Sequence, residues 1–318
     1  MKSNLPILHH LNDFLDYLDI EKGLANNSQK NYNLFLNKFF NWLKENDKSK
    51  LKPHELTYKH VWDYKLYLSR SQSLTTHKNL KRKTQNYYLI ALRSLLDFFA
   101  DRDIDTLPSS KIKLPKVSKD KVPNFLTIED VEKLLSEPDV DNKIGLRDKS
   151  ILEAFFSTGM RIAELTSLNR DQFNHLKMEE GLEMTIIGKG DKPRTVYFSK
   201  RSLKWLKEYL DTRTDLDKSL FIRYSGNKSD SRRLSIRSIE KLVKKYAKLA
   251  GLPIDITPHT LRHSYATDLL TQGVDLRTVQ EFLGHSNILT TQIYTHVTNK
   301  RLRDVHKKYH SGNRLKDN

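Results

Sequence analysis

The segment LPSSKIKLPKVSKDKVP, residues 107–123, divides the chain into two parts. It contains three prolines and no apolar period, whereas long helical patterns lie on both sides of it. A proline pushes the preceding residue toward extended backbone, so the segment is predicted to be a linker. A chain of 318 residues can bury two cores. We therefore expect an N-terminal domain over 1–108, a linker over 109–123 and a C-terminal domain over 124–318.

Before this segment, apolar residues recur at helical spacing in four stretches. Ser28 is expected to cap the second helix and Thr57 the third, because their hydroxyls can accept a hydrogen bond from the first turn. The pattern predicts a small four-helix bundle made of residues 6–20, 28–46, 57–70 and 84–102.

After the segment, the sequence mixes helices with one pair of strands. LEMTIIGKGDKPRTVYF, residues 182–198, has two β-like runs around a glycine-rich turn and predicts a β-hairpin. The fold class predicted for the whole chain is therefore mainly α, with a small sheet in the second domain. Helices are expected around the hairpin at 127–137, 146–159, 199–210, 235–251, 257–273, 275–285 and 299–310.

The charge of the chain points to a polyanionic partner. The formal net charge is +17 and the isoelectric point is near 9.7, as expected of a protein that displaces counterions from a phosphate backbone. The alternative is that these are solvated lysines that only keep the protein in solution. Residues 64–96 carry seven basic side chains and no acid, and a second basic run lies at 223–237. The candidates for contact with a DNA backbone are Lys81, Arg82, Lys83, Arg93, Arg232, Arg233 and Arg237.

Composition also excludes several classes of protein. The chain has no cysteine, which rules out disulfides and thiolate chemistry and fits a reducing cytoplasm. No apolar run approaches the length of a membrane span. The first residues carry acids where a signal peptide would be apolar. We expect a cytoplasmic protein.

Two short motifs place arginines near helix starts. In TPHTLRH, His259 and Arg262 are three residues apart and share one helix face, a combination suited to a phosphate. In TGMRIAEL, Arg161 follows Gly159, and Glu164 lies three positions further on, where it could orient a neighbouring side chain. Each motif alone also fits an ordinary helix surface.

Three more candidates are equally weak in isolation. Lys189 lies between two glycines at the tip of the predicted hairpin, where a lysine could approach a ligand and give up a proton. His285 follows Gly284 at the end of a predicted helix, and Tyr294 comes nine residues later. A turn lysine, a helix-end histidine and one of 14 tyrosines would each be unremarkable alone.

Taken together and in this order, these seven residues resemble the active site of the tyrosine recombinase family, which includes phage integrases and Xer-type site-specific recombinases. The resemblance covers residues 124 to about 310 and extends more loosely to the N-terminal half. It implies a helical, SAM-like core-binding domain followed by a mostly helical α+β catalytic domain, which form a C-shaped clamp on DNA. The motifs that carry it are TGMRIAEL (158–165), IIGKGDKPR (186–194), TPHTLRHSYAT (257–267) and LGHSNILTTQIYTHV (283–297).

The resemblance implies how such a site cuts DNA. Tyr294 would attack a phosphodiester, giving a 3′-phosphotyrosyl link and a free 5′-hydroxyl. Lys189 would protonate the departing oxygen, and His259 would assist or position Tyr294.

The remaining residues would stabilise the phosphate. Arg161 and Arg262 would bind its two non-bridging oxygens, His285 would donate to a phosphate oxygen, and Glu164 would hold neighbouring catalytic side chains. With two guanidiniums in place, neither a metal nor another cofactor is expected.

The resemblance also implies partners. A homotetramer would act on two synapsed double-stranded DNA sites, one dimer per site, with the helix at 299–310 docked into a neighbouring subunit and an accessory or activator protein as a further partner. Xer-like chromosome dimer resolution is the favoured role. The alternatives are a transposon or phage integrase, a type IB topoisomerase-like enzyme, and a non-catalytic DNA-binding protein.

Overall fold

The chain forms two compact units, Met1–Asp120 and Lys121–Asn318, each with its own hydrophobic core. The structure is a computed structural model and describes residues 1–72, 78–116, 125–173, 181–188, 192–225, 231–252 and 256–284. Within these ranges, none of the helices is both long enough and apolar enough to cross a membrane.

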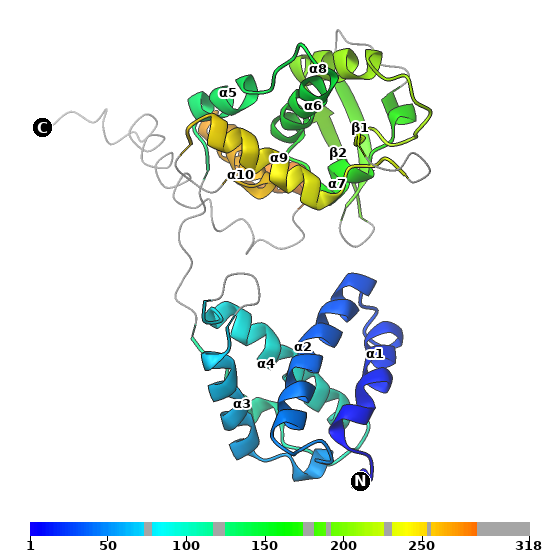
Figure 1. Cartoon of the computed structure of the whole chain (residues 1–318), viewed down its shortest axis with the longest axis vertical. Coiled ribbons are helices and arrows are strands. Elements are labelled where there is room, and N and C mark those ends of the chain that lie inside the picture. Colours follow the sequence, from blue (N-terminus) through cyan, green and yellow to red (C-terminus); the bar gives the residue numbers. More distant parts are fainter. Residues whose placement is uncertain are drawn as a thin grey trace, which may run out of the picture. The chain divides into compact units, whose positions relative to one another are not determined.

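The N-terminal unit is a helical bundle, as predicted (Figure 1). Its core is rich in aromatic side chains, and Phe14, Phe39, Tyr64 and Phe99 are fully buried. The elements are the 3-10 turn η1 (Ile7–His10), α1 (Leu11–Ile20), α2 (Asn26–Glu45), the 3-10 turn η2 (Pro53–Glu55), α3 (Tyr58–Arg70), α4 (Arg82–Asp101) and the 3-10 turn η3 (Ser109–Lys111).

The two helix starts predicted in this unit differ in outcome. The Thr57 hydroxyl accepts a hydrogen bond from the His60 N–H, which confirms Thr57 as the cap of α3. The prediction for Ser28 is wrong, because α2 begins at Asn26 with Ala25 at the capping position. The Ser28 N–H already donates to the Ala25 carbonyl at 2.8 Å, so Ser28 lies inside the first turn.

The proline-containing segment lies partly against the N-terminal unit. Ile112 is buried in its core, with Leu107 and Leu114 packed alongside. The Lys65 ammonium donates to the Lys113 carbonyl at 2.7 Å, and the Asn86 side chain donates to the Pro115 carbonyl at 3.1 Å. Three apolar residues and these hydrogen bonds attach residues 107–116 to α3 and α4. The rest of the predicted linker, up to residue 123, is outside the described residues.

The C-terminal unit is mostly helical, with one antiparallel pair of strands. This confirms the predicted fold class. The strands pair in a register that places Ile186 opposite Arg194. The elements are α5 (Ile128–Ser136), α6 (Lys143–Thr158), α7 (Ile162–Ser167), the 3-10 turn η4 (Arg170–Phe173), β1 (Leu182–Ile187), β2 (Pro193–Phe198), α8 (Lys200–Asp211), α9 (Ile236–Leu249), α10 (Pro258–Thr271) and α11 (Leu276–Leu283). The helix predicted at 299–310 falls outside the described residues.

Helix α6 is the centre of this unit. It packs against α5, α8, α10 and strand β2, and most of its residues are buried. Gly159 ends α6 in the left-handed conformation, with φ of 59°, and the chain turns at once into α7. Thr257 caps α10 and Pro258 occupies its first turn. The start of α10 lies beside the turn that ends α6, because Arg262 donates to the Gly159 carbonyl.

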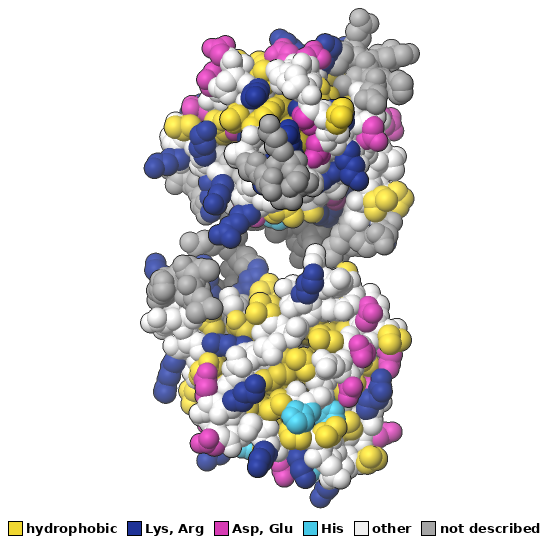
Figure 2. Space-filling view, turned by 45° about the vertical axis from the view of Figure 1, so that its right-hand side comes forward, with side chains coloured by type: hydrophobic (Ala, Val, Ile, Leu, Met, Phe, Trp, Pro, Cys, Tyr) yellow, Lys and Arg dark blue, Asp and Glu magenta, His cyan; other side chains and the backbone are white. Residues whose placement is uncertain are grey.

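The surfaces of the units are mixed in character. On the face seen in Figure 2, Lys and Arg side chains are dispersed over both units, and hydrophobic side chains form a broad area on the N-terminal one. Basic charge is therefore spread over the face in view.

Candidate active site

Arg161 lies at the junction of α6 and α7 with its guanidinium held at both ends. Its Nη1 donates to Glu164 Oε1 at 2.9 Å, and its Nη2 donates to the Gly284 carbonyl at 3.1 Å. The side chain keeps 26% of its surface exposed. Arg161 is thus oriented by the protein and still accessible to a ligand.

Glu164 is the hub beside Arg161. Only 6% of its side-chain surface is exposed. Its carboxylate accepts hydrogen bonds from the Arg161 backbone N–H at 2.8 Å, the Arg161 guanidinium at 2.9 Å and Arg194 Nη2 at 2.5 Å. Burial alone would raise the pKa of Glu164, but these bonds and the two positive charges lower it below the ordinary value. Glu164 is therefore a fixed anion at neutral pH.

Arg194 is a member of this site that was not predicted as a site residue. It lies on β2, where alternation places it on the same face as the buried Val196 and Phe198. Its side chain is only 7% exposed, and besides Glu164 it donates to the Phe282 carbonyl. The available sequence signal was this strand alternation, which points an arginine inward.

Arg262 and His259 come from the first turns of α10. Arg262 is buried, and it donates to the Gly159 carbonyl at 2.6 Å and to the Leu283 carbonyl. His259 keeps an exposed surface. The two residues lie three positions apart on the helix, as predicted, but in different surroundings.

The end of α11 connects the three arginines. The carbonyls of Phe282, Leu283 and Gly284 are consecutive, and they accept from Arg194, Arg262 and Arg161 respectively. The last carbonyls of a helix lack partners within the helix and carry its negative partial charge, so they attract cations. Three guanidiniums from different elements therefore converge on one helix turn.

Two histidines beside the arginines are held in the neutral form. Partial burial lowers the pKa of His259 from 6.5, and the nearby guanidiniums of Arg262 and Arg161 lower it further, against the effect of Glu240. Burial, His259 and Arg262 lower the pKa of His263 to about 4. At neutral pH the positive charge of this cluster therefore resides on its arginines.

The structure thus brings together Arg161, Glu164, His259 and Arg262 of the seven predicted residues. Lys189, His285 and Tyr294 are outside the described residues. The residues next to two of them are described: Gly188 approaches Glu164, since a Cβ built on it would lie 3.6 Å from Oε1, and Gly284 ends α11.

The candidate DNA contacts fall into two groups. Arg233 is engaged within the protein, because it donates to the carbonyls of Thr166 and Leu168 and to the Asn169 side chain. Arg93 and Arg232 are partly buried. The exposed members are Lys81, Arg82 and Lys83 at the start of α4, and Arg237 on α9.

Comparison with known proteins identifies the family. The model of the phage integrase family matches residues 124–301, and that of the phage integrase N-terminal SAM-like domain matches residues 11–103. The chain belongs to the phage integrase family of tyrosine recombinases, as the sequence motifs predicted. Its function is site-specific recombination of the Xer kind, a conclusion that its relatives support.

Two of these relatives are similar to this protein over nearly its whole length. The tyrosine recombinase XerD of Listeria innocua is 37% identical, over 94% of this chain and 98% of its own length. The tyrosine recombinase XerC of Natranaerobius thermophilus is also 37% identical, over 95% and 98%. The crystal structure of the XerH site-specific recombinase bound to its difH substrate has the same fold, with a TM-score of 0.69 and 24% identity over 96% of this chain and 97% of that one.

The contacts of Arg233 predict a structural effect of its replacement. Arg233→Gln should lower the free energy of unfolding by about 2–3 kcal/mol, because carbonyl oxygens of the 166–169 segment lose charged donors. Arg237→Gln, an exposed change on α9, should leave it within about 0.5 kcal/mol. Chemical denaturation of both variants measures the difference, and equal stabilities would contradict the role of Arg233 as an internal support.

Proposed function

We propose that Arg161 and Arg262 bind the scissile phosphate of a double-stranded recombination site. The observation that carries this proposal is that two guanidiniums, one from Arg161 just before α7 and one from Arg262 on α10, donate to the adjacent carbonyls of Gly284 and Leu283. Two guanidiniums held this close can each bind one non-bridging oxygen. Fixed charge of this kind stabilises the negative charge that accumulates on phosphorus in the transition state.

The nucleophile in this proposal is Tyr294. Its phenol oxygen attacks phosphorus, the bond to the 5′-oxygen breaks, and a 3′-phosphotyrosyl link forms. Lys189 gives its proton to the 5′-oxygen, and neutral His259 takes or directs the proton of the phenol. His285 donates to a phosphate oxygen. The 5′-hydroxyl of another strand then attacks the phosphotyrosine, which passes the reaction through a Holliday junction and restores the DNA.

We further place the enzyme in the housekeeping branch of its family, as a cytoplasmic protein that resolves chromosome dimers. The support is the whole-chain similarity to proteins named XerD and XerC. In this proposal, two dimers, each on one DNA site, form the active homotetramer, and an accessory or activator protein starts the reaction.

The start of α4 is the candidate contact with the DNA backbone in the N-terminal unit. Lys81, Arg82 and Lys83 are exposed at a helix N-terminus, where the helix dipole disfavours cations. Basic residues at this position weaken the isolated helix, but together with its free N–H groups they form a site for phosphates. Arg237 on α9 is the corresponding candidate in the C-terminal unit.

Replacement of the nucleophile tests the reaction. Tyr294→Phe should form no covalent adduct with a nicked suicide duplex, while its affinity for the uncut site should stay within about threefold, because only a hydroxyl is lost. Denaturing gels detect the adduct and a mobility-shift titration measures affinity. An adduct formed by the variant, or binding lost to the same extent as cleavage, would contradict the assignment.

The pKa of His259 predicts the acid limit of cleavage. Because neutral His259 is the proposed active form and its pKa lies below 6.5, the single-turnover rate should fall to half of its maximum only at a pH below 6.5. Glu240 raises this pKa, so Glu240→Gln should move the decline to still lower pH. An identical pH profile for both proteins would count against His259 as the titrating group.

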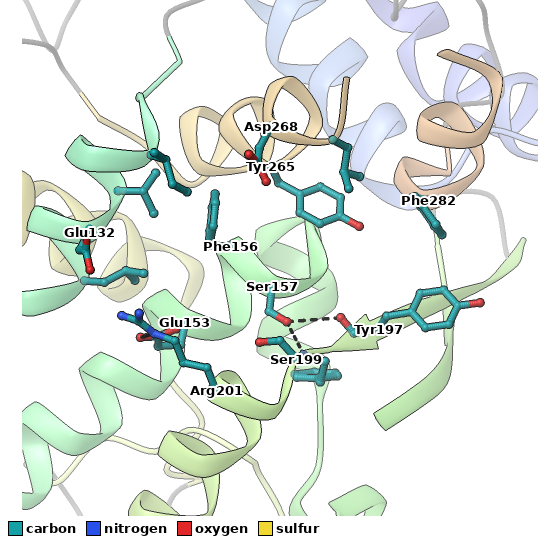
Figure 3. A pocket seen from close by; sticks show the side chains of 15 residues that line it. Glu132, Glu153, Phe156, Ser157, Tyr197, Ser199, Arg201, Tyr265, Asp268 and Phe282 are labelled. Atoms are coloured by element: carbon teal, nitrogen blue, oxygen red, sulfur yellow. Dashed lines mark hydrogen bonds and ion pairs between the residues drawn. The ribbon is translucent and has the colours of Figure 1, made fainter. Parts of the chain in front are cut away.

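A cavity in the C-terminal unit is the candidate acceptor for the terminal segment of another subunit. It has a volume of about 670 Å³ and lies between α5, α6, β2 and α10. Phe156, Tyr265 and Phe282 project into it, and Glu132 and Asp268 lie at its edge (Figure 3). The segment NKRLRDVHKKYH, 299–310, combines apolar and basic residues, so it complements the apolar walls of the cavity and the carboxylates of Glu132 and Asp268. The one basic residue in the described lining, Arg201, is paired with Glu153.

Removal of this segment tests the docking. A chain that lacks residues 299–318 should bind one site normally and lose synapsis of two sites. Leu269→Arg, which places a cation in the cavity, should have the same effect, and the double variant should be no worse than either. Native gels with two labelled duplexes measure synapsis, and additive losses or an unaffected truncation would argue for another acceptor.

A further inference from the structure

Burial of Arg194 on strand β2 carries an unfavourable desolvation free energy. It is 7% exposed, it is paired with a carboxylate that is 6% exposed, and its Nε–H is buried with no acceptor among the described residues. A buried ion pair adds little net stability, since an apolar side chain of similar size would often serve as well. Arg194 is therefore expected to serve a function other than stability.

The contacts of Arg194 and Arg161 form a closed ring. Glu164 bridges the two guanidiniums, with Oε1 toward Arg161 at 2.9 Å and Oε2 toward Arg194 at 2.5 Å. On the opposite side both arginines donate to the same turn of α11, Arg161 to the Gly284 carbonyl and Arg194 to that of Phe282. Each arginine thus contacts the same two supports.

The ring is also closely packed. Gly284 has φ of 60°, and a Cβ built on it would lie 2.4 Å from Arg194 Cδ and 3.0 Å from Nε. Only glycine can therefore occupy this position while Arg194 passes beneath it. The side chain of Arg194 has little room to move, which is the property required of a group that fixes another.

We infer that Arg194 is a positioning residue for Arg161: by holding Glu164 Oε2 and the turn at 282–284, it fixes the direction in which the Arg161 guanidinium meets the phosphate. The inference rests on the proposed role of Arg161 and adds a residue to it. Without Arg194, Glu164 Oε2 keeps only the Arg161 backbone N–H of its two donors, and the α11 turn loses the donor to its Phe282 carbonyl. Arg161 then keeps its charge, but both groups that orient its guanidinium are held less firmly.

The test compares two substrates that differ in charge. Arg194→Lys keeps the positive charge, but one ammonium cannot reproduce the two-ended fork. Its single-turnover cleavage of an ordinary phosphate should fall about 10–100-fold, as expected when a catalytic group is misplaced by an ångström or so. On a methylphosphonate at the same position, which lacks one anionic oxygen and needs less arginine stabilisation, the loss should be under about threefold. Binding of the uncut site should not change.

Arg147→Lys is the matched control, because Arg147 is also buried and binds a carboxylate, that of Asp148, and a backbone carbonyl, that of Ile222. It should cleave both substrates at the wild-type rate at a temperature where thermal unfolding shows each protein to be folded. An equal loss for Arg194→Lys on both substrates would indicate a general structural role and overturn the inference, as would wild-type rates or a matching defect in Arg147→Lys. If the wild-type protein itself forms no adduct, the proposed reaction fails as well; a wild-type adduct with an unaffected Arg194→Lys rejects Arg194 alone.

Discussion

The candidate active site depends on the hydrogen bonds between three guanidiniums and the last turn of α11. Carbonyls at a helix C-terminus have no partners within the helix and carry partial negative charge. Here they are satisfied by Arg161, Arg194 and Arg262, which come from three different elements. The same bonds satisfy the helix end and bring the arginines together. The geometry of the site is thus set by the place where α11 ends, and Gly284 permits that end by adopting the left-handed conformation.

Many arginines of the C-terminal unit act as internal supports of the backbone. Arg213 donates to the carbonyls of Asp217, Ser219 and Leu220, Arg147 to that of Ile222, and Arg233 to those of Thr166 and Leu168. These arginines contribute to the net charge of +17, but their guanidiniums are engaged by backbone carbonyls of the protein itself. The net charge therefore overestimates the number of basic side chains that can contact DNA. The exposed basic residues at the start of α4 are better candidates for this contact than the buried arginines of the C-terminal unit.

The sequence was sufficient for the elements and for the identity of the family. Apolar periodicity predicted the helical bundle and the hairpin, and the hydroxyl of Thr57 marked a helix start because it accepts the expected bond. The prediction of Ser28 as a helix cap was wrong, because several polar residues follow one another at 26–30 and do not mark a single start. The helix begins two residues earlier, at Asn26. The four described catalytic candidates were found through their motifs, and their roles remain proposals.

Periodicity and motifs could not predict which groups within the protein each arginine contacts. Arg194 lies on the inward face of β2, but an arginine is rarely buried unless it is paired with a carboxylate. Its partner, Glu164, lies 30 positions earlier in the chain, so the sequence near Arg194 does not reveal the pair. Arg233 was selected for a basic run, and its acceptors lie more than 60 positions earlier. Both cases depend on contacts between distant segments, which local patterns do not contain.

The same distances have a consequence for how the protein becomes active during synthesis. The bonds that align the arginines join residues 123, 103 and 88 positions apart in the chain. Contacts of such separation form only when the intervening chain has been closed into the fold, so they belong to the late stages of folding. The three arginines are therefore aligned only once the chain has folded as far as Gly284. A chain synthesised only to the end of α10 has all three arginines without the turn that orients them.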